Sequence, residues 1–121
     1  MWRCGLGVKV FMEFGHVVVE GPAEEVAEVL RGLSSESGVT EDLEDTLRIL
    51  SNFDVFHGML RRKFKEYIAP RRSEGDLISG RVLVDKVKLH VEGGVKKATV
   101  IFDKRVPYDK VVRHVDNPSQ T

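Results

Sequence analysis

The sequence of 121 residues contains one cysteine, Cys4, and no long apolar run. A single cysteine excludes an internal disulfide framework, and without an activating neighbour Cys4 is expected to be a small buried hydrophobic residue. No stretch reaches the roughly 18 to 20 apolar residues of a membrane-spanning helix, and residues 1–5 lack the apolar run of a signal peptide. We therefore expect a cytoplasmic protein that does not enter a membrane.

Side-chain amides are also scarce, with only Asn52, Asn117 and Gln120 present. Few amides, 31% charged residues and abundant valine are typical of a thermophile. The length and the 41% hydrophobic content suit one domain with its own core. We expect this domain to span residues 1–115 and residues 116–121 to form a frayed tail.

The usual sequence signatures of catalysis and cofactor binding are missing. The four histidines, His16, His57, His90 and His114, have no second ligand at metal-binding spacing. No phosphate-binding loop, dinucleotide fingerprint or nucleophile elbow is found. Acidic pairs such as Glu24-Glu25 and Glu41-Asp42 are expected on solvated helix faces or first turns. The sequence predicts no enzyme, no metal and no cofactor.

The first half of the chain predicts a hairpin followed by helices. Residues 7–14 alternate as a strand, Gly15-His16 reverses the chain, and residues 17–20 form its partner. A helix over residues 23–33 follows Pro22. A second helix begins after a Thr40 cap, and its apolar residues predict about seven turns ending at Ala69-Pro70, with Gly58 as a position where it can bend.

The second half predicts another hairpin and a last helix. Residues 81–91 and 95–103 are valine-rich strands joined by Gly93-Gly94, a two-residue turn signal that places Leu89 opposite Ala98. Residues 71–80 are expected to be a mobile loop, and residues 107–115 a short helix. The prediction is an α+β fold of order β-β-α-α-β-β-α, with a small antiparallel sheet of about four strands covered by helices.

The formal net charge of zero conceals two regions of opposite charge. Residues 20–54 contain ten acidic and two basic side chains, whereas residues 55–121 contain eight acidic and fifteen basic ones. A basic region of this kind is typical of a protein that binds a polyanion. Residues 56–67 also interleave aromatic and cationic side chains, which suits phosphate contact combined with base stacking.

Two basic surfaces are predicted, one at the end of the long helix and its loop and one on the outer face of the second hairpin. An ordinary solvated sheet face explains the hairpin pattern equally well, and helix-dipole preference explains part of the helix-end charge. Phe56 is expected to be exposed, whereas the positions of Phe64 and Tyr67 favour the core. The candidate phosphate-binding residues are Arg61, Arg62, Lys63, Lys65, Arg71, Arg72, Lys86, Lys88, His90 and Lys97, and the candidate stacking residues are Phe56, Phe64 and Tyr67.

In its size, composition and basic aromatic stretch over residues 56–67, the chain resembles the ThermoDBP type of archaeal single-stranded DNA-binding protein. The resemblance implies binding of single-stranded DNA with little sequence preference, in a cleft with a hydrophobic base and basic rims.

Two functions therefore remain open. The first is non-enzymatic binding of single-stranded nucleic acid, DNA before RNA. The second is a protein interaction module or homo-oligomer in which the acidic residues 20–54 of one molecule meet the basic surface of another.

Overall fold

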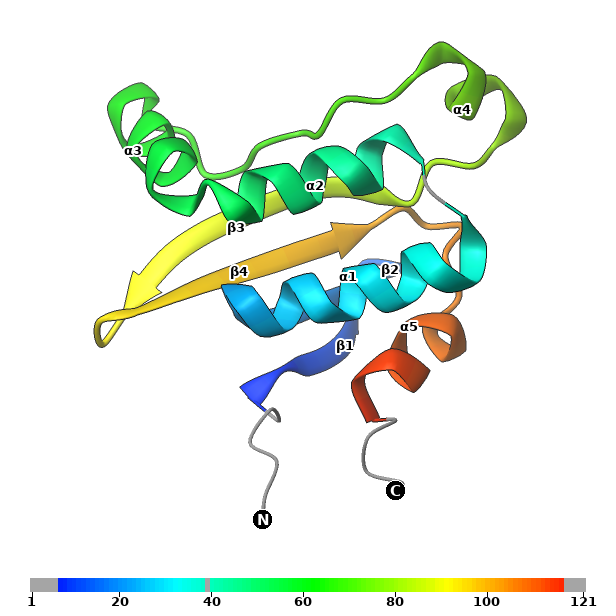
Figure 1. Cartoon of the computed structure of the whole chain (residues 1–121), viewed down its shortest axis with the longest axis horizontal. Helices are drawn as coiled ribbons and strands as arrows, with labels where there is room; N and C mark the ends of the chain where they lie inside the picture. Colours follow the sequence, from blue (N-terminus) through cyan, green and yellow to red (C-terminus); the bar gives the residue numbers. More distant parts are fainter. Residues whose placement is uncertain (1–6, 39, 117–121) are drawn as a thin grey trace.

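The structure, a computed structural model, describes residues 7–38 and 40–116. These residues form an α+β fold, as expected, with two hairpins joined into one antiparallel sheet of order β1-β2-β4-β3 (Figure 1). The expectations for Cys4 and for residues 117–121 lie outside the described residues. The strands are β1 (Lys9–Glu13), β2 (His16–Pro22), β3 (Val84–Glu92) and β4 (Val95–Phe102), and the helices are α1 (Ala23–Ser37), α2 (Glu41–Ser51), α3 (Phe53–Lys63), α4 (Glu74–Ser79) and α5 (Tyr108–Asp116).

The second hairpin has the predicted register. Leu89 lies opposite Ala98, and the turn residues Gly93 and Gly94 both have positive φ, as a tight hairpin turn requires. In the first hairpin the reversal is one residue earlier than expected. Phe14 and Gly15 form the turn with φ of 52° and 84°, and His16 already pairs with Glu13.

The single long helix predicted after Thr40 is wrong, because two helices occupy this region. The break lies at Asn52 and not at Gly58. The backbone N–H of Asn52 donates to the carbonyls of Arg48 and Ile49, and its side-chain amide also donates to Arg48, which closes α2. Helix α3 then continues through Gly58 and ends at Phe64, whose φ of 54° is left-handed.

Residues 71–80 were expected to be a mobile loop, and this expectation is wrong. They contain α4, whose N-cap Ser73 accepts a hydrogen bond from the N–H of Asp76. The buried carboxylate of Asp76 in turn accepts the N–H of Glu41. Helix α4 is therefore tied to the start of α2.

The expectation that Glu41 and Asp42 form a solvated acidic pair is wrong for Asp42, which is buried. Its side chain is 0% exposed, and one carboxylate oxygen accepts the N–H groups of Leu83 and Val84, each at 2.6 Å. The other oxygen accepts the Thr40 hydroxyl and the N–H of Leu43. The acid joins the beginning of α2 to the beginning of β3, which are about 40 residues apart in the chain.

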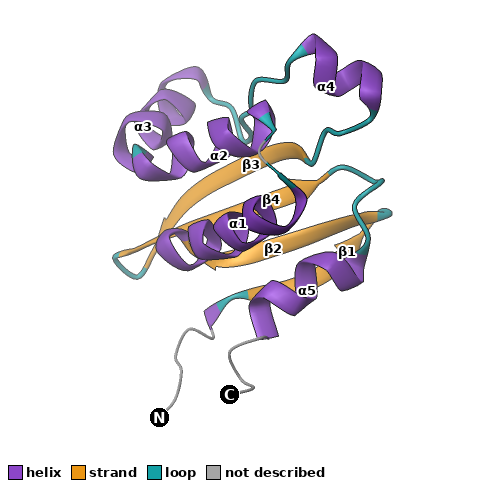
Figure 2. Ribbon diagram, turned by 45° about the vertical axis from the view of Figure 1, so that its right-hand side comes forward, coloured by secondary structure: helices purple, strands orange, loops and turns teal. Residues whose placement is uncertain are grey.

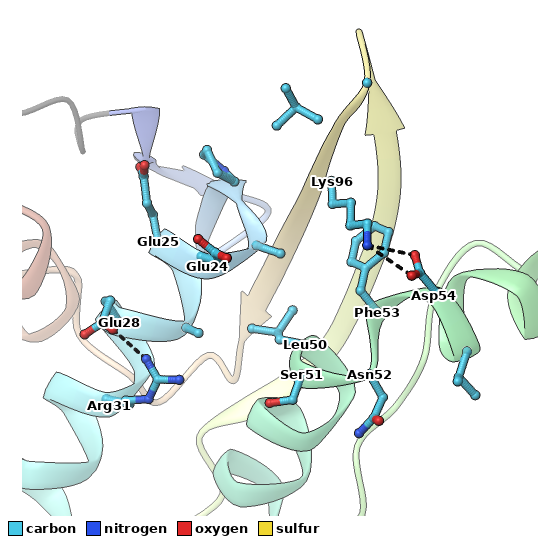
Figure 3. A pocket seen from close by; sticks show the side chains of 16 residues that line it. Glu24, Glu25, Glu28, Arg31, Leu50, Ser51, Asn52, Phe53, Asp54 and Lys96 are labelled. Atoms are coloured by element: carbon cyan, nitrogen blue, oxygen red, sulfur yellow. Dashed lines mark hydrogen bonds and ion pairs between the residues drawn. The ribbon is translucent and has the colours of Figure 1, made fainter.

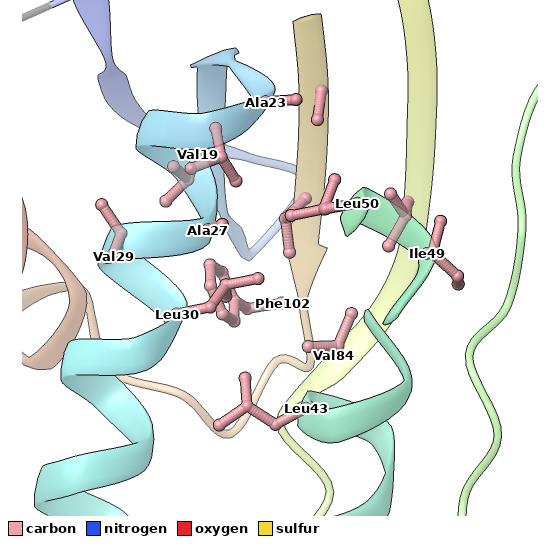
Figure 4. Close-up of a cluster of buried hydrophobic side chains, with 14 of the residues drawn as sticks. Val19, Ala23, Ala27, Val29, Leu30, Leu43, Ile49, Leu50, Val84 and Phe102 are labelled. Carbon is pink, nitrogen blue, oxygen red and sulfur yellow. The ribbon is translucent and has the colours of Figure 1, made fainter. Parts of the chain in front are cut away.

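The core lies between one face of the sheet and the helices α1, α2 and α5 (Figures 1 and 2). Alternation along each strand decides which side chains enter it. The strand side chains of this face are buried in the core, and Figure 4 shows Leu30 of α1 and Leu43 of α2 facing Phe102 of β4. In the second hairpin the buried residues of this face include Val87, Leu89, Ala98, Val100 and Phe102.

Candidate nucleic-acid interface

The sheet face opposite the core is not packed against any helix of the described residues, and we call it the uncovered face. The ladder registers arrange its side chains in rows that run across the strands. The central pair, Val18 and Ile101, is 1% and 8% exposed, so larger neighbours form the accessible surface. The rows are Phe11, Val18, Ile101 and Lys86; Lys9, Glu20, Thr99 and Lys88; and Pro22, Lys97 and His90.

Cations outnumber acids among the side chains of these rows. The predicted residues Lys86, Lys88, His90 and Lys97 share this face, as the hairpin alternation required. Lys97 pairs with Glu92 at 3.1 Å, and the Lys88 ammonium lies 3.7 Å from the carboxylate of Glu66. Within the described part of the chain, Lys86 has no carboxylate partner, so its ammonium is available to an external anion.

The pKa of Glu92 is affected by the positive charges on this surface. Its pKa is lowered from the ordinary value, first by the hydrogen bond from Lys97 and then by the positive charge of Lys97, while desolvation acts in the opposite direction. The charges of His90 and Lys9 lower the pKa further. Cations from β1, β3 and β4 therefore act on one carboxylate at this end of the sheet.

Tyr67 places an aromatic ring beside the uncovered face. The chain leaving α3 runs along the β3 edge, where Ile68 and Val87 exchange two backbone hydrogen bonds of 2.8 Å. Tyr67, the preceding residue, has the Lys86 ammonium 4.6 Å from its ring centre. A partly exposed ring and a cation at this spacing offer a base a stacking surface next to a phosphate contact.

The cationic end of α3 lies within a few residues of Tyr67 along the chain. Its basic side chains are exposed, and among the described residues they form no ion pair. Phe64 is 96% exposed, so the prediction that it belongs to the core is wrong. The left-handed conformation at Phe64 ends the helix and directs the ring away from the core stripe. The cations are Arg61, Arg62, Lys63 and Lys65.

Other candidate residues have structural roles. Phe56, expected to be exposed, is half-buried against the core, and the Arg48 guanidinium lies 5.2 Å from its ring centre. Arg72 donates to the carbonyls of Val84 and Asp85, which fixes it at the start of β3. The N–H of Arg71 is bound by a buried carboxylate, but its side chain is exposed.

Sequence reasoning missed two residues of this surface, Lys9 and Phe11. Both lie on the uncovered face through the pairing of β1 with β2, and Phe11 is 37% exposed. Alternation along residues 7–14 already placed them on the same side of the first strand. The missing information was the contact between the two hairpins, formed where Val18 pairs with Ile101.

A cleft lies on the helical side of the sheet. It has a volume of about 920 Å³ and opens between the start of α1, the α2–α3 junction and the turn of the second hairpin (Figure 3). Leu50 and Phe53 lie at its centre, and acids surround it. Two of them are paired, Glu28 with Arg31 at 2.6 Å and Asp54 with Lys96 at 3.0 Å. This cleft is lined by more acidic than basic side chains, so it is not the basic cleft that the resemblance implies.

Comparison with models of known protein families, with curated proteins and with solved structures finds no match for this chain. Within residues 7–38 and 40–116, no helix is long and apolar enough to cross a membrane. The same residues contain no group of three or more histidine, cysteine or acidic side chains arranged to hold a metal ion.

Proposed function

We propose that this protein binds single-stranded nucleic acid, DNA before RNA, on the uncovered face and the adjoining end of α3. The observation that carries the proposal is the contact of Lys86 with the ring of Tyr67, a few residues along the chain from the cations at the end of α3. Phosphates would contact Lys86, Lys88 and Lys97 on the sheet and the four cations of residues 61–65. Bases would stack on Tyr67, Phe64 and Phe11.

The geometry favours single strands over duplexes. The proposed contacts include aromatic rings, and a base stacks on such a ring only when it is unpaired. Stacking accepts every base, so we expect little sequence preference. The proposal includes no catalytic step, and the acidic cleft on the helical side would face away from the bound strand.

A labelled oligonucleotide titrated by fluorescence anisotropy at several salt concentrations tests the proposal. The logarithm of the affinity should fall linearly with the logarithm of salt concentration, with a slope of about −0.7 for each phosphate contacted. Unlabelled duplex of the same sequence should compete weakly. Absence of binding at low salt would reject the function, and stronger competition by duplex would reject the single-stranded mode.

A further inference from the structure

The outer edge of β1 is an unpaired sheet edge. β1 is the first strand in the order β1-β2-β4-β3, so β2 pairs with only one of its two sides. Glu13 and His16 flank a two-residue turn and form a hydrogen-bonded pair, and alternation then turns the backbone groups of Val10 and Met12 outward. No hydrogen bond from the described residues reaches these outward groups.

This edge has few of the features that normally prevent sheets from pairing. Proteins protect such edges with proline, bulges or central charges. β1 has no proline or bulge, and its charges lie only at its ends. Two of its three apolar side chains are exposed, Phe11 at 37% and Met12 at 53%. Helix α5 packs against β1 but leaves about half of Met12 exposed.

The sequence of β1 is complementary to itself. In an antiparallel pair centred on Phe11, Lys9 of each molecule faces Glu13 of the other, so two ion pairs form. The outward N–H and C=O groups of Val10 in one molecule lie opposite those of Met12 in the other, so these two residues form hydrogen-bonded pairs. Phe11 faces its own copy at a non-hydrogen-bonded position, where side chains approach most closely. A register shifted by two residues loses both ion pairs.

We propose that two copies of this chain associate through antiparallel pairing of their β1 edges, centred on Phe11. The interface is isologous, so it closes as a dimer with a twofold axis. The two sheets become one continuous sheet of twice four strands. If the proposed function holds, the uncovered faces join and each dimer contacts a longer stretch of nucleic acid than one copy does.

Light scattering coupled to size-exclusion chromatography tests the dimer in the full chain without nucleic acid. The expected mass is twice the chain mass of 13.7 kDa. Lys9→Glu and Glu13→Lys each place like charges opposite one another at both ends, so each should weaken dimerisation about tenfold or more. The combined exchange restores opposite charges and should restore the dimer. A monomeric protein, or a dimer that both single variants leave unchanged, would overturn the proposal.

A cross-link tests the register separately. In a Cys4→Ser background, Phe11→Cys places two sulfurs across the twofold axis with Cα atoms about 4.5 Å apart, which suits a disulfide. Oxidised glutathione should therefore give a covalent dimer. Lys9→Cys is the matched control, because its two copies would be roughly 14 Å apart. Equal cross-linking of both variants, or none with Phe11→Cys, would overturn the Phe11-centred register.

Met12→Pro separates this proposal from the proposed function. Proline removes the outward N–H but leaves the ladder to β2 intact. The variant should be monomeric and should still bind a short single-stranded oligonucleotide. A dimeric Met12→Pro protein counts against the β1 interface, whereas loss of oligonucleotide binding by wild type and variant alike counts only against the function.

Discussion

The ammonium group of Lys86 lies 4.6 Å from the centre of the Tyr67 ring, although the two residues belong to segments separated by α4. The contact exists because residues 66–68 run along the β3 edge after leaving α3. It combines on one surface the two groups that a single strand requires, a cation for phosphate and a ring for a base.

Tyr67→Ala should weaken binding of single-stranded DNA by about 5- to 150-fold, because loss of one stacking contact costs roughly 1 to 3 kcal/mol. Tyr67→Phe is the matched control and should bind almost normally, since the ring remains. Anisotropy titrations of both variants, with thermal unfolding to confirm that they fold, make the comparison. Equal affinity of the alanine and phenylalanine variants would remove Tyr67 from the interface.

Replacing Arg61, Arg62 and Lys65 together by glutamine should reduce the salt slope of binding by up to about 2, since each lost phosphate contact contributes about 0.7. All three side chains are exposed, so the unfolding temperature should change little.

The matched control for this triple variant removes the same charge elsewhere. Arg31, Lys104 and Lys110 belong to the helical side and to the α5 end of the chain. Their joint replacement by glutamine should leave the salt slope nearly unchanged. If both triple variants lower the slope equally, the protein binds by net charge alone and the α3 end has no special role.

Asp42→Asn should destabilise the fold by about 3 kcal/mol or more. Asparagine keeps one acceptor oxygen, so it can still accept either the Leu83 and Val84 pair or the Thr40 and Leu43 pair, but not both. The other two donors would face an amide nitrogen, and buried groups left without partners cost about 1 to 3 kcal/mol each. Urea unfolding monitored by circular dichroism measures the change. Glu44→Gln, an exposed acid of the same helix, should have little effect. A loss below about 1 kcal/mol for Asp42→Asn would contradict the assigned role.

Phe14→Asn should stabilise the protein by about 1 kcal/mol, because a left-handed backbone costs a bulky residue more than asparagine, and Asn-Gly is a preferred two-residue hairpin turn. Phe14 has φ of 52° and is 89% exposed, so little packing is lost. Thermal unfolding of this variant should give a higher midpoint than that of wild type. Phe14→Ala removes the ring without supplying turn preference and should not reproduce the gain.

Glu36 should make stability depend on pH in the acid range. Its pKa is lowered from the ordinary 4.5, chiefly by its hydrogen bond with His114, and also by the charge of Arg113. A carboxylate with a lowered folded-state pKa stabilises the fold fully above its unfolded pKa and loses that contribution as pH falls through the folded value. The difference in unfolding temperature between wild type and Glu36→Gln should therefore shrink as the pH falls below about 4.5. A difference that grows below this pH would contradict the assignment.

Local sequence patterns were sufficient for the strands and for the faces of the second hairpin. Gly93-Gly94 determined the turn, and a two-residue turn fixes every pair that follows, including Lys88 with Thr99. Local sequence patterns were insufficient to show that residues 41–63 form two helices and not one. The apolar spacing of residues 43–67 continues through both helices, and no residue between them is a strong helix breaker, so periodicity could not reveal that the chain bends at Asn52.

The site was only partly predictable for the same reason. The alternation of residues 86–90 assigned the lysines to one face, but whether a helix covers that face depends on contacts between distant segments. Arg72 had the charge of a ligand-binding residue, and the structure uses it to bind two carbonyl oxygens. Phe64, expected in the core, is exposed, and Phe56, expected to be exposed, is half-buried, because the helix is interrupted at Asn52.

The sequence alone determined what depends on neighbours in the chain: strand alternation, the glycine turn of the second hairpin and the separation of acidic from basic regions. Tertiary structure decided what depends on contacts between segments. It buried Asp42 against the first residues of β3, left one face of the sheet without a helix from the described residues, and brought Lys86 over the Tyr67 ring. The physical reason is that local propensities act over a few residues, whereas burial and hydrogen-bond partners are set by whichever distant segment packs against them.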